Sequence, residues 1–214
     1  KLKPKSTSFI MNPTKISKVR GRPRRFDPDN AVMTAQQLFH ARGYDAVSVA
    51  DILEALGINP PSFYSAFDSK AGLYTRVLDR WATTGAIPLQ EILRADRPVA
   101  EALAEVLEEA ARRYSSDPAA GCLVLESTRC NDTEVREAAL ACTIAAETVI
   151  REYISERHPQ AAASVTDYIS TTMSGLSAKA RNGSDLTRLL ATARLASSVL
   201  EQALSPDKKS TRLD

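Results

Sequence analysis

Helical periodicity runs through most of the chain and constrains its fold more than any other feature. From Asp27 onward, apolar residues recur at the three- and four-residue spacing of one helix face, beginning with Ala31, Val32, Ala35 and Leu38. This spacing leaves little room for a parallel sheet. The sequence therefore predicts an all-α chain of about nine helices.

Capping residues mark the ends of the first helices. Asp27 is a favourable N-cap for a helix that Gly43 should end in the left-handed conformation. Ser48 and Asp51 form a capping-box-like pair at the start of the next helix, which Gly57 closes. A third helix follows within a few residues. Two short helices around a glycine-containing turn predict a helix-turn-helix, whose second helix normally enters the major groove of DNA.

The second helix of this helix-turn-helix, which is the third helix of the chain, begins in the segment GINPPSFYSAF (residues 57–67). This segment contains two prolines. A proline at a helix start forfeits no hydrogen bond, because the first N–H groups have no partner within the helix. Pro61 disfavours the helical conformation at Pro60, so we expect the helix to begin at Pro61 with Asn59 outside it. Phe63 and Phe67 share the face that should pack inward. The outward side chains, with hydroxyls suited to phosphates and base edges, are Ser62, Tyr64 and Ser65.

Basic residues gather before the helices. Nine of the 28 basic residues and none of the 26 acidic ones fall in residues 1–26, so the other 188 residues carry a net charge of −7. If translation starts at Met11, six basic residues and no acidic one remain in this arm. Its RGRPRRF segment (residues 20–26) resembles the core of an AT-hook, whose arginines lie along a narrow minor groove. A basic arm indicates a polyanionic partner, and a solvated tail without a partner is the alternative.

Four segments within residues 26–81 form a distinctive set: LFHARGYDAVSV, ADILEALGI, SFYSAF and DSKAGLY. Together they resemble the DNA-binding domain of the TetR/AcrR family of transcriptional regulators. The resemblance implies a homodimer whose two reading helices enter successive major grooves of a palindromic operator in double-stranded DNA. By position it also implies DNA contacts from Ser62 and Tyr64, a phosphate contact from Lys70 and a backbone contact from Ser48.

This chain departs from the family pattern at Pro60 and Ala66, where many members carry longer polar side chains. We therefore expect few direct hydrogen bonds to bases, with apolar contacts to thymine methyl groups and the basic arm compensating. The residues expected to contact DNA are Arg20, Arg22, Arg24, Arg25, Ser48, Pro60, Pro61, Ser62, Tyr64, Ser65 and Lys70.

The chain is expected to have four parts. They are a flexible basic arm (1–26), a helix-turn-helix domain (27–75), a helical effector-binding and dimerisation domain (76–205) and a C-terminal tail (206–214). Ser69 should cap a helix that runs to about Leu93, with an interruption at Pro88. Asp132 should cap a long helix over 133–158, and Asn182 with Gly183 should separate the last two helices.

The predicted function is that of a TetR-type repressor, which binds its operator as a homodimer and is released by a small-molecule effector. The last two helices are rich in Ala, Ser, Thr and Leu, which permits close helix packing. A dimer interface is expected at Val165, Ile169, Met173, Leu176, Leu189, Ala193, Val199 and Leu200, with ordinary core packing as the alternative.

The family resemblance also implies an effector pocket among the middle helices. Candidate lining residues are Trp81, Tyr114, Cys122, Thr128, Tyr153, Tyr168 and Met173, and for each of them ordinary core packing is the commoner role.

Two other regulatory modes stay open. Cys122 lies at an irregular turn and Cys130 follows Arg129, whose charge would lower a thiol pKa, so reversible oxidation of these cysteines is one alternative. Buried, inert thiols would exclude it. The second alternative is a DNA-bound scaffold that recruits a protein partner without an inducer.

Several functional classes find no support in the sequence. It has no apolar run long enough to span a membrane, and no P-loop, dinucleotide fingerprint or nucleophile elbow. His40 and His158 lie far apart, without a metal-binding spacing around them. Three irregularly spaced cysteines fit a reduced compartment. We expect a cytoplasmic, nucleoid-associated protein with no catalytic site, no metal and no cofactor.

Overall fold

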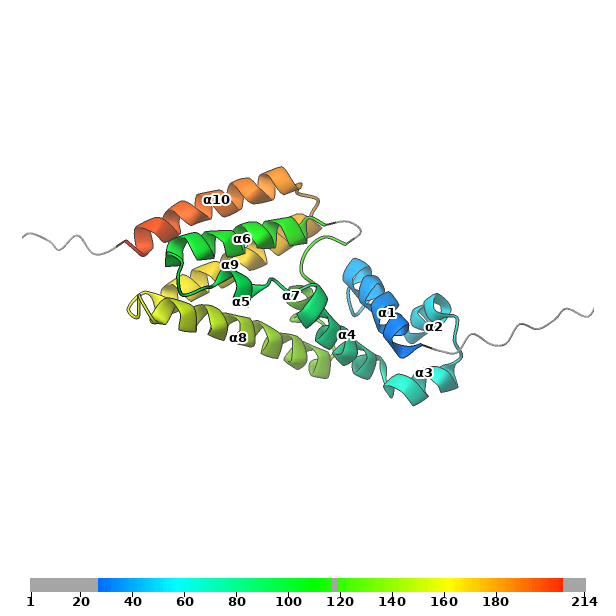
Figure 1. Ribbon diagram of the computed structural model, residues 1–214. Coiled ribbons are helices and arrows are strands. Elements are labelled where there is room, and N and C mark those ends of the chain that lie inside the picture. The colour runs from blue at the N-terminus through cyan, green and yellow to red at the C-terminus, as the bar shows by residue number, and fades with distance from the viewer. Residues whose placement is uncertain (1–26, 117–118, 206–214) are drawn as a thin grey trace, which may run out of the picture.

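A computed structural model describes residues 27–116 and 119–205, which form ten helical segments and no strand (Figure 1). The all-α class is thereby confirmed. The segments are α1 (Pro28–Arg42), α2 (Val49–Leu56), α3 (Pro60–Phe67), α4 (Lys70–Thr84), α5 (Leu89–Ile92), α6 (Val99–Tyr114), α7 (Leu123–Ser127), α8 (Thr133–Ser155), α9 (Ala162–Arg181) and α10 (Leu186–Ala203). Two of them, α5 and α7, are only 4 and 5 residues long.

Polar side chains begin several helices where the sequence predicts them. The carboxylate of Asp27 accepts the N–H of Asp29 at 3.1 Å, and the hydroxyl of Ser69 accepts the N–H of Gly72 at 2.9 Å. Ser48 and Asp51 form the complete capping box of α2. Each such cap stabilises a helix by about 1 kcal/mol, because it satisfies an N–H that has no partner within the helix.

Two features of the helix ends differ from the prediction. Gly57 closes α2 as expected, and it does so in the left-handed conformation. Gly43 has a positive φ of 79°, but its ψ of 157° places it outside the left-handed helical region. The long helix α8 ends at Ser155, before the predicted residue 158.

Helix α4 is shorter than predicted. Instead of running to about Leu93 it ends at Thr84, and the short α5 begins only after Pro88. Gly85 caps α4 and donates its N–H to the carbonyl of Trp81 at 2.9 Å. A Cβ at Gly85 would lie 2.5 Å from the Trp81 indole. The Trp81 ring therefore occupies the space that a side chain at position 85 would need, and the chain turns at a glycine.

Helices α1, α2, α3 and the first half of α4 form one end of the molecule, which we call the head (Figure 1). Its core is aromatic: Phe39 stacks on Tyr44 with centroids 5.6 Å apart, and Tyr74 meets both rings edge-on at 5.1 Å. Leu123 and Val135, from α7 and α8, complete the same core. The head is therefore packed continuously against the rest of the protein.

The remaining helices form the body. Its centre is α6, whose wide apolar face packs against α10 and α9, while α8 packs against α9 (Figure 1). Helix α4 runs between head and body, with Val77 in the head core and Trp81 packed against both cores. The predicted domain boundary after residue 75 falls inside this helix, and the four-part division of the chain stays a prediction.

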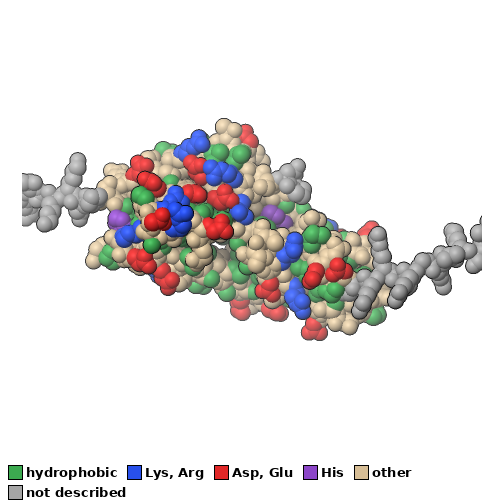
Figure 2. Space-filling view, viewed as in Figure 1, with side chains coloured by type: hydrophobic (Ala, Val, Ile, Leu, Met, Phe, Trp, Pro, Cys, Tyr) green, Lys and Arg blue, Asp and Glu red, His purple; other side chains and the backbone are tan. Residues whose placement is uncertain are grey.

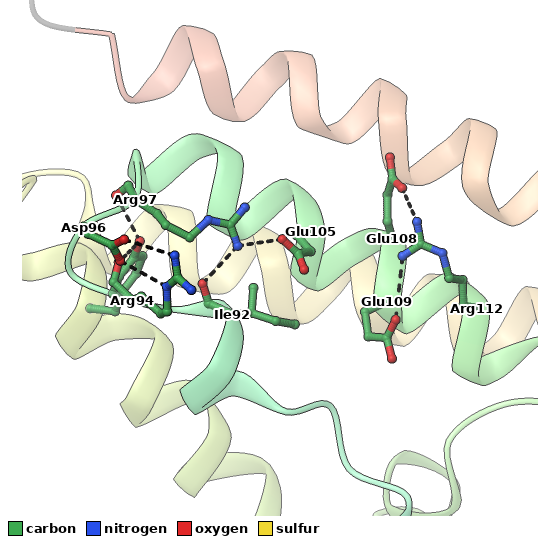
Figure 3. A network of polar contacts seen from close by, with 9 residues as sticks. Ile92, Arg94, Asp96, Arg97, Glu105, Glu108, Glu109 and Arg112 are labelled. Carbon is green, nitrogen blue, oxygen red and sulfur yellow. Dashed lines mark hydrogen bonds and ion pairs between the residues drawn. The ribbon is translucent and has the colours of Figure 1, made fainter.

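Charged side chains gather on one face of the body. Basic and acidic groups alternate over this face, which is seen in Figure 2. In the network of Figure 3, Arg97 lies 2.6 Å from Glu105, and Arg112 lies 2.6 Å from Glu108. Such solvent-exposed pairs contribute at most about 1 kcal/mol each, so they form an ordinary solvated surface rather than a site.

Candidate nucleic-acid interface and interior cavity

Helix α3 begins one residue earlier than predicted. Pro60 and Pro61 occupy its first two positions, and Asn59 is the N-cap. The Asn59 side chain accepts the N–H of Ser62 at 2.9 Å. The expected start at Pro61 is therefore wrong, because the cap at Asn59 stabilises a helical Pro60 against the steric effect of the proline that follows it.

The two faces of α3 divide as the sequence predicts. Phe63 and Phe67 are buried in the head core, with exposed fractions of 0% and 5%. Tyr64 is half exposed, and Pro60, Pro61 and Ser65 are exposed beside it, while Ser62 and Ala66 are partly buried. This helix lies at the end of the head that is farthest from α10 (Figure 1). Its outward face offers one phenol, one exposed hydroxyl and two apolar rings.

Two other predicted DNA contacts are engaged locally. The Ser48 hydroxyl donates to the carboxylate of Asp51, and hydrogen bonds from Ser48 are the main reason that the Asp51 pKa falls to about 2. The Lys70 ammonium lies 3.8 Å from the centroid of the Tyr44 ring, and burial lowers the pKa of Lys70. Contact of Ser48 or Lys70 with DNA stays a prediction.

The predicted contacts of the basic arm, Arg20, Arg22, Arg24 and Arg25, lie outside the described residues. Their role also stays a prediction.

The body contains a cavity of about 320 Å³ between α4, α6, α7, α8 and α9. Four of the seven predicted pocket residues line it: Trp81, Tyr114, Cys122 and Met173. The cavity is therefore built largely from apolar and aromatic side chains, as ligand pockets commonly are.

Three predicted pocket residues do not line this cavity. The Tyr153 hydroxyl donates to the carbonyls of Arg94 and Arg97 at 3.1 and 3.3 Å, which ties α8 to the loop before α6. Tyr168 donates to the carbonyl of Ala196 at 3.4 Å, and Thr128 bonds within its own turn. The two tyrosine hydroxyls therefore join elements of the body to one another, and Thr128 stabilises only its own turn.

Sequence reasoning missed Cys142, Glu147 and Ser170, which all line the cavity. Glu147 was open to recognition, because it is a single acid inside the apolar helical stretch IAAETVI. The Ser170 hydroxyl on α9 donates to Oε1 of Glu147 on α8. A carboxylate is thereby fixed at the wall of an otherwise apolar space.

The expected lowering of a cysteine pKa is wrong. Burial raises the pKa of both Cys122 and Cys130. Arg129 lies 3.8 Å from Glu126, and the carboxylate of Asp45 raises the Cys130 pKa further. A thiol held in its protonated form is a poor nucleophile, so this geometry does not favour switching by oxidation.

One junction joins the cavity wall to the head. Nε2 of His40 on α1 donates to the carbonyl of Gly121 at 2.9 Å, and its ring meets Trp81 edge-on at 5.0 Å. Gly121 precedes the cavity residue Cys122. The φ of Gly121 is +84°, and a Cβ at this position would lie 2.8 Å from the Arg181 side chain. Two groups that touch the cavity wall therefore hold the same histidine of the head.

A second junction lies at the start of α8. Tyr44 donates to the carboxylate of Asp132, the N-cap of α8, at 2.8 Å, and this bond holds the Asp132 pKa below its usual range. The carboxylate of Asp45 accepts two bonds from Asn131, at 3.0 and 3.1 Å. The turn between α1 and α2 is thereby anchored to the body.

Most of the predicted dimer-interface residues lie in the core of the single chain. The buried ones, each at most 4% exposed, are Val165, Ile169, Leu176, Leu189, Ala193 and Leu200. Met173 faces the cavity, and only Val199, at 45% exposed, remains available to a partner. As interface residues the buried set is wrong, because the strongest apolar stripe of each helix faces α6 and its own core.

Within the described part of the chain, no cluster of His, Cys, Asp and Glu side chains could hold a metal ion. No helix there is long and apolar enough to cross a membrane.

Comparison with known proteins shows which proteins this chain resembles. The family profile described as "Bacterial regulatory proteins, tetR family" matches residues 32–77, which extend from α1 into α4. The chain is 56% identical over 191 residues to the HTH-type transcriptional repressor BdcR of Escherichia coli (strain K12), covering 89% of this chain and 97% of BdcR. It is 29% identical over 189 residues to the HTH-type transcriptional repressor ComR of the same organism, covering 82% of this chain and 89% of ComR.

A solved structure has the same arrangement. It is a cysteine mutant of the TetR family transcriptional regulator CifR, complexed with 26-bp double-strand operator DNA. The TM-score is 0.75 at 31% identity, over 83% of this chain and 98% of that chain. The resemblance seen in residues 26–81 is confirmed, and it extends through the body. An identity of 56% across nearly all of BdcR, with the profile matching the helix-turn-helix, shows that this chain belongs to the TetR family of bacterial regulatory proteins.

Proposed function

We propose that this protein is a transcriptional repressor that binds a palindromic operator as a homodimer and is released when a small molecule enters the cavity. The observation that carries the proposal is the outward face of α3. Phe63 and Phe67 fix the helix in the head core, and Tyr64 with Ser65 stands exposed at the far end of the molecule.

The names of similar proteins support the repressor assignment. BdcR and ComR are both named transcriptional repressors, and CifR was solved with operator DNA. The alignment with BdcR spans nearly all of both chains, so it includes the body as well as the head.

The chemistry of α3 suggests how it recognises DNA. Its exposed surface has few hydrogen-bonding groups, so Pro60 and Pro61 are proposed to contact thymine methyl groups, and Tyr64 a phosphate or base edge. The basic arm of residues 1–26 is proposed to add phosphate and minor-groove contacts, which strengthen binding at every site.

Dimerisation is proposed through the outward faces of α9 and α10. On α10 the exposed large apolar residues are Leu186, Leu195 and Val199, and Leu195 is 72% exposed. On α9, a Cβ added at Gly175 would meet nothing within 4 Å, so a partner helix can approach closely there. Two such helix pairs would bury the apolar side chains in a four-helix interface.

Release is proposed to act through the His40 junction. A ligand that displaces Trp81 or the Cys122 segment alters both groups that hold His40, and α1 carries this change to α3 within the packed head. A rigid-body shift of the two heads would change the distance between the reading helices.

Selection of binding sites from a random-sequence DNA pool tests the DNA-binding proposal. The purified protein should enrich two inverted half-sites, with centres separated by one or more helical turns, because two-fold symmetry of the dimer is mirrored in its site. Enrichment of a single asymmetric half-site would contradict the homodimeric reading of DNA, and enrichment of no sequence would contradict the repressor assignment.

A further inference from the structure

We infer that the cavity takes a hydrophobic amine, whose protonated nitrogen pairs with the carboxylate of Glu147. The inference rests on the proposed function, since it names the chemical class of the effector that the cavity admits.

The walls of the cavity select for an apolar ligand. They include Trp81, Ile87, Val124, Leu125, Ile150 and Met173, which come from four helices and the segment after α4. An apolar ligand gains free energy by leaving water for such a surface. The same surface penalises any charged ligand that finds no partner inside.

Glu147 supplies one negative charge to this space. None of the residues that line the cavity in the described chain is a lysine, an arginine or a histidine. The other ionisable groups at the wall are neutral, because burial raises the pKa values of Tyr114, Cys122 and Cys142. The electrostatic character of the cavity is therefore set by a single carboxylate.

The carboxylate is held in place but only partly satisfied. Oε1 of Glu147 accepts from the Ser170 hydroxyl, whereas Oε2 has no hydrogen-bond partner among the described residues. No lysine or arginine in the described ranges lies within ion-pair distance of it. A carboxylate beside apolar groups is stabilised by a cation that also donates a hydrogen bond, and an alkylammonium group does both.

Three probes of equal chain length test this inference: octylamine, octanol and octanoate, with binding measured by titration calorimetry at about pH 7. The amine is protonated there, as a lysine side chain is. We expect octylamine to bind about tenfold more tightly than octanol, and octanoate to bind weakest, because a charge-assisted hydrogen bond forms only with the amine.

Two matched variants test whether the preference for the amine depends on Glu147. Glu147→Gln should remove the preference for the amine while octanol still binds. Glu152→Gln replaces an exposed glutamate of the same helix, outside the cavity, and should keep the preference. Thermal unfolding of each variant without ligand checks that it is folded.

The outcomes separate the inference from the proposed function. Equal binding of the three probes, or a preference that survives Glu147→Gln in a folded variant, overturns the inference and leaves an apolar effector cavity in place. If no probe binds the wild-type protein, both the inference and the effector-release part of the proposed function are contradicted.

Discussion

Asn59 determines where α3 begins. Pro60 and Pro61 hold the first two helical positions and carry no N–H, so the N–H of Ser62 is the first donor that needs a partner. The Asn59 side chain accepts it at 2.9 Å. The cap therefore satisfies the first N–H within the helix, and the prolines contribute a φ that is already helical.

Replacing this cap should destabilise α3. We expect Asn59→Ala to lower the free energy of unfolding by about 1 kcal/mol, because the Ser62 N–H loses its acceptor, whereas Asn59→Ser should retain most of it. Urea unfolding of the two variants and the wild type measures the difference. Equal midpoints for Asn59→Ala and the wild type would show that the cap contributes nothing.

At this scale the sequence predicts what depends on neighbours along the chain. The caps at Asp27, Ser48 and Ser69 were predictable, because N-capping involves residues two or three positions apart. The start of α3 was missed by one residue. The thiol pKa of Cys130 was not predictable, since it depends on burial and on Asp45 from a distant segment.

At the scale of elements, α9 and α10 show why interface residues are hard to predict. Periodicity finds the most apolar stripe of a helix, but it does not say whether that stripe faces the chain's own core or a partner. In α10 the stripe through Leu189, Ala193 and Leu200 is fully buried, while Leu195 and Val199 lie on the other side. The presence and order of the helices were predictable from the sequence, and the face each one offers a partner was not.

A pair of α10 variants tests the proposed dimer interface. Leu195→Asp should weaken dimerisation at least tenfold while leaving the fold intact, because a charge would enter an apolar interface without a partner. Leu200→Ala should instead lower the free energy of unfolding by about 2–5 kcal/mol, since it leaves a cavity in the core. Sedimentation velocity and urea unfolding distinguish the two effects. A Leu195→Asp protein that dimerises like the wild type would exclude this face.

At the scale of the whole molecule, a few contacts hold the head against the body. The two cores meet at Trp81, and the polar junctions at His40, Tyr44 and Asp45 fix the head from two sides. These contacts join residues more than 80 positions apart in the chain. Sequence reasoning had no means to find these contacts, nor the hydrogen bond that joins Ser170 on α9 to Glu147 on α8.

The His40 junction should make stability depend on pH. Burial lowers the pKa of His40 from 6.5, Arg181 lowers it further, and Glu126 and the Gly121 carbonyl oppose this shift. Between the folded-state pKa and 6.5 the unfolded chain binds more protons, so the free energy of unfolding falls as the pH drops below 6.5.

Urea unfolding between about pH 7.5 and about pH 5.5 measures this dependence. His40→Gln should have a flatter profile than the wild type over that range, and His158→Gln controls for replacing a histidine elsewhere. A wild-type profile that is flat, or that His40→Gln leaves unchanged, would show that burial of this histidine does not link the junction to pH.

The exposed face of α3 is proposed to read operator DNA, and Tyr64 is the residue of that face to change. Fluorescence anisotropy with the DNA site obtained by selection measures it directly. We predict that Tyr64→Ala raises the dissociation constant at least tenfold, at about 1–3 kcal/mol per lost contact, while its unfolding midpoint stays that of the wild type. An unchanged dissociation constant in a folded Tyr64→Ala protein would contradict the assignment of α3 as the reading helix.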